Sequence, residues 1–398
     1  MPPPALSIDE PLEEMERMAP GLSPRKKGTA PSPAEMVLEN HCFEATVEKL
    51  PSLEGKAIAI TGTTSGTGYW CAMTAIQKGA SCVFLLNRQS DRSAFTDSEM
   101  KAAATSATAV LSVDCDLNSF ASCRAAAEKV LVTSKDFGGL DVLACNAGVM
   151  AMPDERTADG YDIQMQCNGL SHFLLTALLM PALESASKAR GEARIVQHSS
   201  GARFFPLGKH PTTHYMAACE ANTLGGNGGA FAVANFAAPQ NTRYNHTKLA
   251  CAQYALALHN ILQAKGSKVK SLVCEPGIAA TSLPANGWQT APGTSLPGFA
   301  FKMMMPMFKR MFQSGPDGTC PLLMACFATE ATSGDFWTPR DQAPGMRYLG
   351  LGPYITGPPI RTIINGIAAM PGMEKRTLDK EAQAALMAAA EEATGEKL

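Results

Sequence analysis

From Lys56 onward the chain alternates between two kinds of segment. Short apolar runs, typical of buried strands, are separated by longer segments whose apolar residues recur at three- and four-residue spacing, as in amphipathic helices. We expect strands at 57–61, 82–87, 109–113, 142–145, 194–198 and 269–274, with a weaker one at 335–337. We expect helices at 66–78, 118–133, 159–180, 244–264 and 315–329. This alternation predicts an α/β fold with a single Rossmann-type, doubly wound parallel sheet of about seven strands and helices on both faces.

The 398 residues divide into three parts. Residues 1–50 are expected to form an N-terminal tail, disordered in part, because the segment opens on consecutive prolines, is rich in glutamate and lacks an apolar signal region. Residues 51–345 hold the Rossmann-type domain. Residues 346–398 form a C-terminal extension that ends in an alanine-rich helix at 378–393.

Two stretches interrupt the alternation inside the domain. The first, 202–243, is rich in Gly, Ala and Asn and is too long for an ordinary connection, so we expect a functional loop there. The second, 284–313, is rich in Met and Phe, which suit a lid over a bulky apolar ligand. A core or interface helix is an equal alternative for this stretch. Peripheral contact with a membrane ranks last, because the stretch carries few basic residues.

Charge and cysteine content narrow the classes of function. A formal net charge of -2 gives no general attraction to phosphate backbones, so we expect a small-molecule substrate and no nucleic acid. The 12 cysteines are spread along the chain without a CxxC pair, which indicates buried thiols in the cytoplasm or another reducing compartment. Import into an organelle stays open. No run approaches the roughly 18 apolar residues of a transmembrane helix.

A glycine-rich loop joins the first expected strand to the first helix. Glycines let the backbone turn tightly and approach a pyrophosphate closely, while the N–H groups and dipole of the helix N-terminus favour its negative charge. A simple glycine turn is the alternative, but the strand-loop-helix context favours a dinucleotide site. The candidate binding residues of this loop are Gly62, Thr64, Ser65, Gly66, Thr67 and Gly68.

The Gly-x-x-x-Gly-x-Gly spacing of this loop resembles the short-chain dehydrogenase/reductase family. Three further segments match the family in order: Asp116-Leu117, Asn146-Ala147-Gly148, and Pro276-Gly277 followed by Thr281. The resemblance covers about residues 53 to 340. It implies that the first segment contacts the adenine, that the last closes over the nicotinamide, and that 51–345 is the catalytic domain.

The end of the second expected strand indicates which nicotinamide cofactor is bound. An NAD enzyme normally has a carboxylate there for the ribose hydroxyls, whereas this chain has Asn87-Arg88. Without the acid a 2′-phosphate is not repelled, and a guanidinium can bind it bidentately. We therefore expect NADP(H). A solvated surface arginine is the alternative for Arg88.

Tyr244 and Lys248 are the candidate catalytic pair and also belong to the expected cofactor site. At a spacing of four on one helix the phenol and the ammonium share a face. An unperturbed tyrosine has a pKa of about 10, and a neighbouring cation favours the phenolate. The pair is therefore suited to general acid-base catalysis. Tyr-x-x-x-Lys alone is a weak signal, and its place after the other family segments makes it informative.

The family resemblance adds a serine and an asparagine. Of the two serines after the fifth expected strand, alignment selects Ser200, whose hydroxyl can hold the substrate oxygen; Ser199 is interpreted as a strand-end hydroxyl. Asn168 matches the asparagine that helps hold a water near the lysine. His172 is interpreted as structural, and the histidines lack metal-ligand spacing, so no metal is expected.

Within the family, Asn87-Arg88, the Asn168 segment and residues 314–337 resemble most the branch of retinol dehydrogenases and protochlorophyllide reductases. We expect an NADPH-dependent carbonyl reductase or alcohol dehydrogenase. A light-dependent protochlorophyllide reductase-like enzyme is one alternative, although such enzymes place cysteine where this chain has Ile278. A non-catalytic NADP(H)-binding protein is the other, because fold alone does not prove activity. Family members often form dimers or tetramers, so a homo-oligomer is a further expectation.

Overall fold

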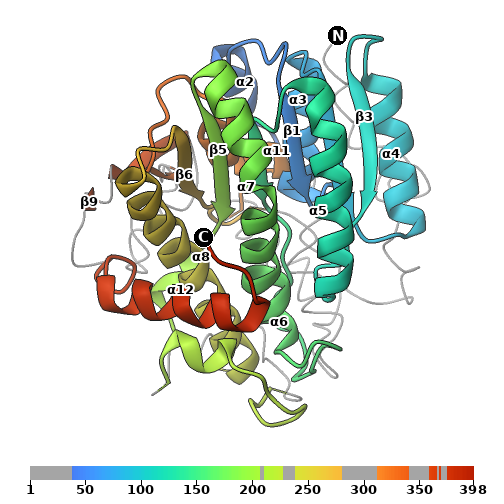
Figure 1. Ribbon diagram of the computed structural model, residues 1–398. Helices are drawn as coiled ribbons and strands as arrows, with labels where there is room; N and C mark the ends of the chain where they lie inside the picture. Colours follow the sequence, from blue (N-terminus) through green and yellow to red (C-terminus); the bar gives the residue numbers. More distant parts are fainter. Residues whose placement is uncertain are drawn as a thin grey trace, which may run out of the picture.

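The computed structural model describes residues 38–206, 210–226, 238–279, 312–339, 358–364, 367–368 and 374–398. One sheet, in the order β3-β2-β1-β4-β5-β6-β7-β8-β9, forms the centre of the molecule (Figure 1). The first seven strands of this order pair in parallel, and β8 and β9 are added antiparallel. The strands are β1 (Ala57–Thr61), β2 (Cys82–Asn87), β3 (Ala109–Asp114), β4 (Val142–Cys145), β5 (Ala193–His198), β6 (Val269–Cys274), β7 (Phe336–Pro339), β8 (Pro359–Ile364) and β9 (Ile367–Ala368). The predicted Rossmann-type parallel sheet is confirmed.

The central strands are buried on both faces, which explains their nearly continuous apolar sequences. Every residue of β1, β4 and β5 is buried. In the register of β1, Ile60 lies between Leu85 of β2 and Ala144 of β4. Parallel strands covered by helices have no solvated face, so they show no polar alternation.

Helices cover the sheet on both faces, and two hydrophobic clusters fill the space beneath them. The first layer, in front of the sheet in Figure 1, contains α5 (Phe120–Ser134), α7 (Ser171–Arg190) and α8 (Pro239–Ala264), with α12 (Lys380–Thr394) packed against α8. The second contains α2 (Phe43–Lys49), α3 (Gly66–Gln77), α4 (Asp91–Ala103) and α11 (Gly315–Phe327). Short helical turns are η2 (Lys135–Phe137), α6 (Ile163–Met165), η3 (Gln166–Leu170), η4 (Gly201–Phe204) and η5 (Thr212–Met216).

Several expected boundaries were wrong. The helix expected at 159–180 begins at Ile163, passes through a π-helical turn and continues to Arg190. The helix of Tyr244 begins at Pro239, because proline is well suited to a first helical turn. Two helices were not predicted: α2, which lies within the expected tail, and α4. In α4 only Thr96 and Met100 are buried, so it lacks an apolar period. The antiparallel strands β8 and β9 of the C-terminal extension were also not predicted.

One helical stretch departs from the expectation that no apolar run approaches the length of a transmembrane helix. Among the described residues, the stretch 163–190 is long and apolar enough to cross a membrane by composition, and 61% of its apolar window is buried inside the protein. It lies in the layer with α5, and its apolar residues belong to the hydrophobic cluster of that layer.

Candidate active site

The glycine-rich loop lies between β1 and the N-terminus of α3, beside the point where the strand order reverses between β1 and β4. Doubly wound sheets bind ligands at this switch point. Gly62 and Gly66 have φ values of 72° and 59°, which favour glycine. The residues of 64–67 are half-buried, and the first turn of α3 contains no acidic side chain. The helix N-terminus therefore presents a positive dipole to this site.

Two of the glycines are required by close contacts. A Cβ on Gly68 would lie 2.2 Å from the carbonyl oxygen of Gly62, and one on Gly62 would lie 2.8 Å from the Cβ of Ala147. Only glycine allows the loop to turn so tightly against the segment after β4. The loop geometry fits a dinucleotide pyrophosphate, which needs close approach to backbone N–H groups.

Asn146 and Thr61 hold the loop and the segment after β4 together. The Asn146 amide donates to the carbonyl oxygen of Thr61 (3.0 Å) and accepts from the hydroxyl of Thr67 (2.8 Å). The hydroxyl of Thr61 accepts from the backbone N–H groups of Asn146 and Ala147, each at 3.0 Å. Asn146 thus supports the backbone of the glycine-rich loop.

The two residues at the end of β2 have different surroundings. Asn87 bonds the loop through both of its side-chain atoms, accepting from the Thr63 N–H (2.8 Å) and donating to the Thr63 hydroxyl (2.7 Å). Arg88 is exposed. Arg92, which sequence reasoning missed, is half-buried and its Nε donates to the carbonyl oxygen of Thr64 (3.2 Å).

The expected adenine segment follows β3. The Asp116 carboxylate accepts from the backbone N–H of Asn118 (3.0 Å), and its own N–H donates to the hydroxyl of Ser122 (2.9 Å). Leu117 is buried, and its carbonyl oxygen accepts from the hydroxyl of Ser171 (2.6 Å). Ser171 therefore ties this segment to the start of α7.

Tyr244 and Lys248 share a face of α8. The Nζ of Lys248 lies 5.7 Å from the centre of the Tyr244 ring and donates to the carbonyl oxygen of His198 at the end of β5 (2.8 Å). A Cβ on Gly148 would lie 3.1 Å from Oδ1 of Asn168 and 3.5 Å from Nζ of Lys248. The expected lysine and asparagine therefore meet at the segment after β4.

Asn168 lies in the π-helical turn 166–170 and is 1% exposed. Its amide donates to the carbonyl oxygen of Val149 (2.9 Å) and to the hydroxyl of Thr247 (3.0 Å), and it accepts from the Val149 N–H (2.8 Å). Asn168 thereby joins the segment after β4 to α8. Single π-helical turns are frequent at functional sites.

The segment after β5 carries the two serines. The hydroxyl of Ser199 donates to the carbonyl oxygen of Lys248 (2.7 Å), in agreement with a strand-end role. Ser200 is half-buried and caps η4. The Asn245 amide donates to the carbonyl oxygen of Phe205 (2.6 Å), so the end of η4 is attached to α8 one residue after Tyr244.

The turn after β6 includes Pro276 and Gly277, and Gly277 has a φ of 65°. The N–H of Gln313 donates to the carbonyl oxygen of Ile278 (2.9 Å), and its side chain donates to that of Pro276. The residues before α11 therefore hold this turn. Thr281 lies outside the described residues.

His172 is a buried residue whose connections sequence reasoning missed. Its Nε2 lies 2.9 Å from the hydroxyl of Thr61, and its Nδ1 lies 3.1 Å from the carbonyl oxygen of Asn168. It therefore links the end of β1 to the π-helical turn. These contacts agree with the interpretation of His172 as a structural histidine. Burial lowers the pKa of His172 to about 4.

This pKa predicts a pH dependence of stability. Between pH 6.5 and about 4 the unfolded chain binds a proton at His172 that the folded chain does not. The contribution of neutral, buried His172 to the free energy of unfolding is therefore fully present above pH 6.5. It should be lost as the pH falls toward about 4. Replacing His172 with Gln should flatten the dependence by about 1.4 kcal/mol per pH unit, measured by urea denaturation. His198 and His246 shift in the same direction in both proteins, so parallel curves for variant and wild type would contradict the prediction.

One group of potential metal ligands occurs among the described residues: Cys42, Asp317 and Cys320. The Asp317 carboxylate accepts from the backbone N–H groups of His41 (2.8 Å), Cys42 (3.0 Å) and Phe43 (2.9 Å). These bonds give Asp317 a structural role, since they satisfy the N–H groups at the start of α2. Eleven of the 12 cysteines are buried free thiols, and Cys219 is half-buried.

Comparisons with known proteins agree with this geometry. Residues 56–221 match the model of the short chain dehydrogenase family. The chain is similar to polyprenol dehydrogenase of Mus musculus, with 31% identity over 327 residues, 76% of this chain and 86% of that protein. It is also similar to retinol dehydrogenase 12 of Mus musculus, with 30% identity over 264 residues, 66% of this chain and 71% of that protein.

The chain therefore belongs to the short-chain dehydrogenase/reductase family, in its retinol dehydrogenase-like branch. It is an oxidoreductase with a nicotinamide cofactor and a small-molecule substrate. A crystal structure of an uncharacterized protein from Mycobacterium paratuberculosis shares the fold, with a TM-score of 0.58 at 23% identity over 88% of this chain and 97% of that chain.

Proposed function

We propose that this oxidoreductase uses NADPH to interconvert a bulky apolar carbonyl compound and its alcohol, with Tyr244 as general acid and base. The observation that carries the proposal is the position of Lys248, whose Nζ lies 5.7 Å from the centre of the Tyr244 ring. NADPH, when bound, supplies the hydride in the reductive direction, and NADP⁺ would accept it in the oxidative direction. The chain's own residues bind and orient the cofactor and move the proton.

In the reductive direction Tyr244 donates its phenolic proton to the carbonyl oxygen as that oxygen gains negative charge. The Lys248 cation favours the resulting phenolate. The Ser200 hydroxyl holds the oxygen beside the phenol, because a hydroxyl can both donate and accept. Asn168 fixes the position of the π-helical turn against α8 through Thr247. In the oxidative direction Tyr244 accepts the proton from the alcohol.

The substrate class rests on the relatives and on composition. Polyprenol and retinol, the alcohols in the names of the similar enzymes, both have long apolar carbon skeletons. The Met- and Phe-rich stretch 284–313 follows the Pro276-Gly277 turn in the sequence, where a substrate lid is expected. We therefore infer a long-chain apolar alcohol or the corresponding aldehyde or ketone.

The test is NADPH consumption by the purified full-length chain with a series of apolar aldehydes and ketones of increasing length. We expect turnover to increase with chain length. Tight NADPH binding with no turnover in the whole series would favour the non-catalytic alternative. Turnover that needs light would favour the protochlorophyllide reductase-like alternative.

The proposed preference for NADPH predicts a selective effect at Arg88. An exposed guanidinium at the end of β2 can pair with a 2′-phosphate, which NADH lacks. Arg88→Ala should therefore weaken NADPH binding by about 1.5–3 kcal/mol, the scale of hydrogen bonds to charged groups, and leave NADH binding nearly unchanged. Fluorescence titration of both cofactors measures the difference.

The matched control is Lys101→Ala, which removes an exposed cation of α4 that pairs with Asp97 at 2.7 Å. It should leave both affinities unchanged. If Arg88→Ala weakened NADPH and NADH binding equally, the assigned role of Arg88 would be refuted.

A further inference from the structure

A buried arginine lies at the beginning of the 202–243 insertion, next to Ser200. Arg203 belongs to η4 and is 2% exposed, and its Nη1 donates to the carbonyl oxygen of Ser200 (3.1 Å). The Cζ of its guanidinium lies 4.0 Å from the centre of the Phe204 ring and 4.2 Å from that of Phe336. Contacts with two rings and a hydrogen bond to the backbone leave this planar group little freedom.

Two buried carboxylates pair with Arg203 from distant parts of the chain. Glu275 follows β6 directly and pairs with Nη1. Glu374 belongs to the C-terminal extension and accepts from Nη2 (2.6 Å) and Nε (3.3 Å). The exposed fractions of the three side chains are only 2% to 3%. We call Arg203, Glu275 and Glu374 the Arg203 triad.

The Arg203 triad is poorly explained as a stabilising device. Burial raises the pKa of Glu275 to about 6, against the opposing effect of Arg203. Burial alone would lower the pKa of Arg203, but the two carboxylates raise it. Because taking three charges out of water costs free energy that apolar packing avoids, a buried ion triad is weak evidence for stability. Its fixed geometry is the feature that an apolar cluster would lack.

The same region holds the C-terminal extension in place. Nη1 of Arg376 donates to the carbonyl oxygen of Pro206 (2.9 Å), just beyond η4. The amide of Gln253, on α8, donates to the carbonyl oxygen of Arg376 (2.8 Å). The extension therefore contacts both the segment of Ser200 and the helix of Tyr244.

We propose that Arg203 is a positioning residue, which holds Ser200 at the substrate oxygen and relies on Glu374 of the C-terminal extension to keep its own orientation. This inference rests on the proposed function, because it assumes that Ser200 contacts the substrate. It assigns a role to two features that lengthen this chain, the insertion after Ser200 and the C-terminal extension. The insertion contributes Arg203 to the triad and the extension contributes Glu374, while Glu275 directly precedes the Pro276-Gly277 turn.

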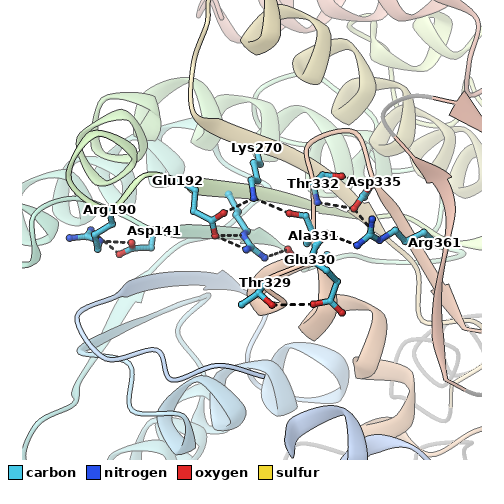
Figure 2. Close-up of polar contacts among 12 residues, drawn as sticks. Asp141, Arg190, Glu192, Lys270, Thr329, Glu330, Ala331, Thr332, Asp335 and Arg361 are labelled. Carbon is cyan, nitrogen blue, oxygen red and sulfur yellow. Dashed lines mark hydrogen bonds and ion pairs between the residues drawn. The ribbon is translucent and has the colours of Figure 1, made fainter. Parts of the chain in front are cut away.

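The first test compares Arg203→Met, which lies just after the end of β5, with a matched control at the start of β5. Arg194, at the start of β5, is also buried; it pairs with Glu192 (2.5 Å) and donates to the carbonyl oxygen of Ala325 (3.3 Å). Glu192 also accepts from Nζ of Lys270, and Figure 2 shows these two residues. Arg203→Met should lower kcat about 100-fold, the scale of a 1 Å displacement, with an unchanged Kd for NADPH. Arg194→Met should change kcat less than about threefold at a similar loss of Tm. Equal loss of kcat in both variants would overturn the proposal.

The second test is a double-mutant cycle with Ser200→Ala. If Arg203 acts through the Ser200 hydroxyl, Arg203→Met should cause almost no further loss of kcat in the Ser200→Ala background. Losses that multiply would show a general structural role and overturn the proposal. A Ser200→Ala variant with wild-type turnover would instead defeat the proposed function itself.

Glu374→Gln keeps the test decisive if Arg203→Met does not fold. The amide preserves the size of the side chain and one acceptor but removes its charge. We expect kcat to fall about tenfold, the scale of losing a supporting contact, while the Kd for NADPH stays constant. Wild-type kcat in this variant, with Ser200→Ala inactive, would reject the positioning role and leave the proposed function intact.

Discussion

Replacing Tyr244 with Phe should lower kcat for hydride transfer about 10²- to 10⁴-fold, the usual contribution of a positioned general acid. Tyr244 is 5% exposed, so phenylalanine can occupy the same space and only the hydroxyl is lost. The Kd for NADPH should change little, because the expected pyrophosphate and adenine contacts follow β1 and β3, whereas Tyr244 lies on α8. Stopped-flow measurement of NADPH oxidation at saturating cofactor separates the chemical step from binding.

The control for this variant is Tyr254→Phe. Tyr254 lies on the same helix α8, is 5% exposed and packs against Phe173 with the ring centres 5.4 Å apart. Loss of the Tyr254 hydroxyl should leave kcat within about twofold of the wild-type value, because this residue belongs to the hydrophobic cluster beneath α7. Equal rates for Tyr244→Phe and wild type, or equal losses in both variants, would show that Tyr244 is not the proton donor.

The parallel sheet could be predicted because each of its strands carries a local signal. Strands β1, β2 and β4 are short apolar runs, and the glycine-rich loop after β1 is itself a sequence pattern. Helix α4 could not be predicted, because it covers the sheet with only two buried residues and has no apolar period. Strand β8 is missing from the prediction because its antiparallel pairing depends on β7, whose partner residues lie 20 to 27 positions earlier in the sequence. Strand β9 in turn pairs with β8.

The candidate site likewise contains some residues that the sequence predicts and others that it does not. Tyr244 and Lys248 are separated by one helical turn, so their spacing alone predicts a shared face. The supporting contacts join residues far apart in the chain: Arg203 to Glu374 across 171 positions, and Asp162 to Arg243 across 81. Burial of charged pairs leaves no periodic or local pattern. These residues therefore become visible only when the tertiary structure places them together.

The buried pair of Asp162 and Arg243 predicts the largest effect on stability. Both side chains are 0% exposed, and Arg243 immediately precedes Tyr244. Asp162→Asn keeps an acceptor for the N–H of Met165 but leaves the Arg243 cation buried without its counter-charge. Removing one partner of a buried pair costs about 3–5 kcal/mol, a large share of the roughly 5–15 kcal/mol that stabilises a folded domain.

Urea denaturation of Asp162→Asn should show this loss directly, and a nearby exposed pair supplies the control. Arg156 and Glu220 pair at 2.7 Å, but their side chains are 41% and 76% exposed. Glu220→Gln should cost at most about 1 kcal/mol, because water already screens that pair. Similar small losses in both variants would mean that Arg243 finds another partner or water when Asp162 is neutral. A large loss at Asp162 alone would establish that the buried carboxylate, through Arg243, holds the beginning of α8 in place one residue before the proposed catalytic tyrosine.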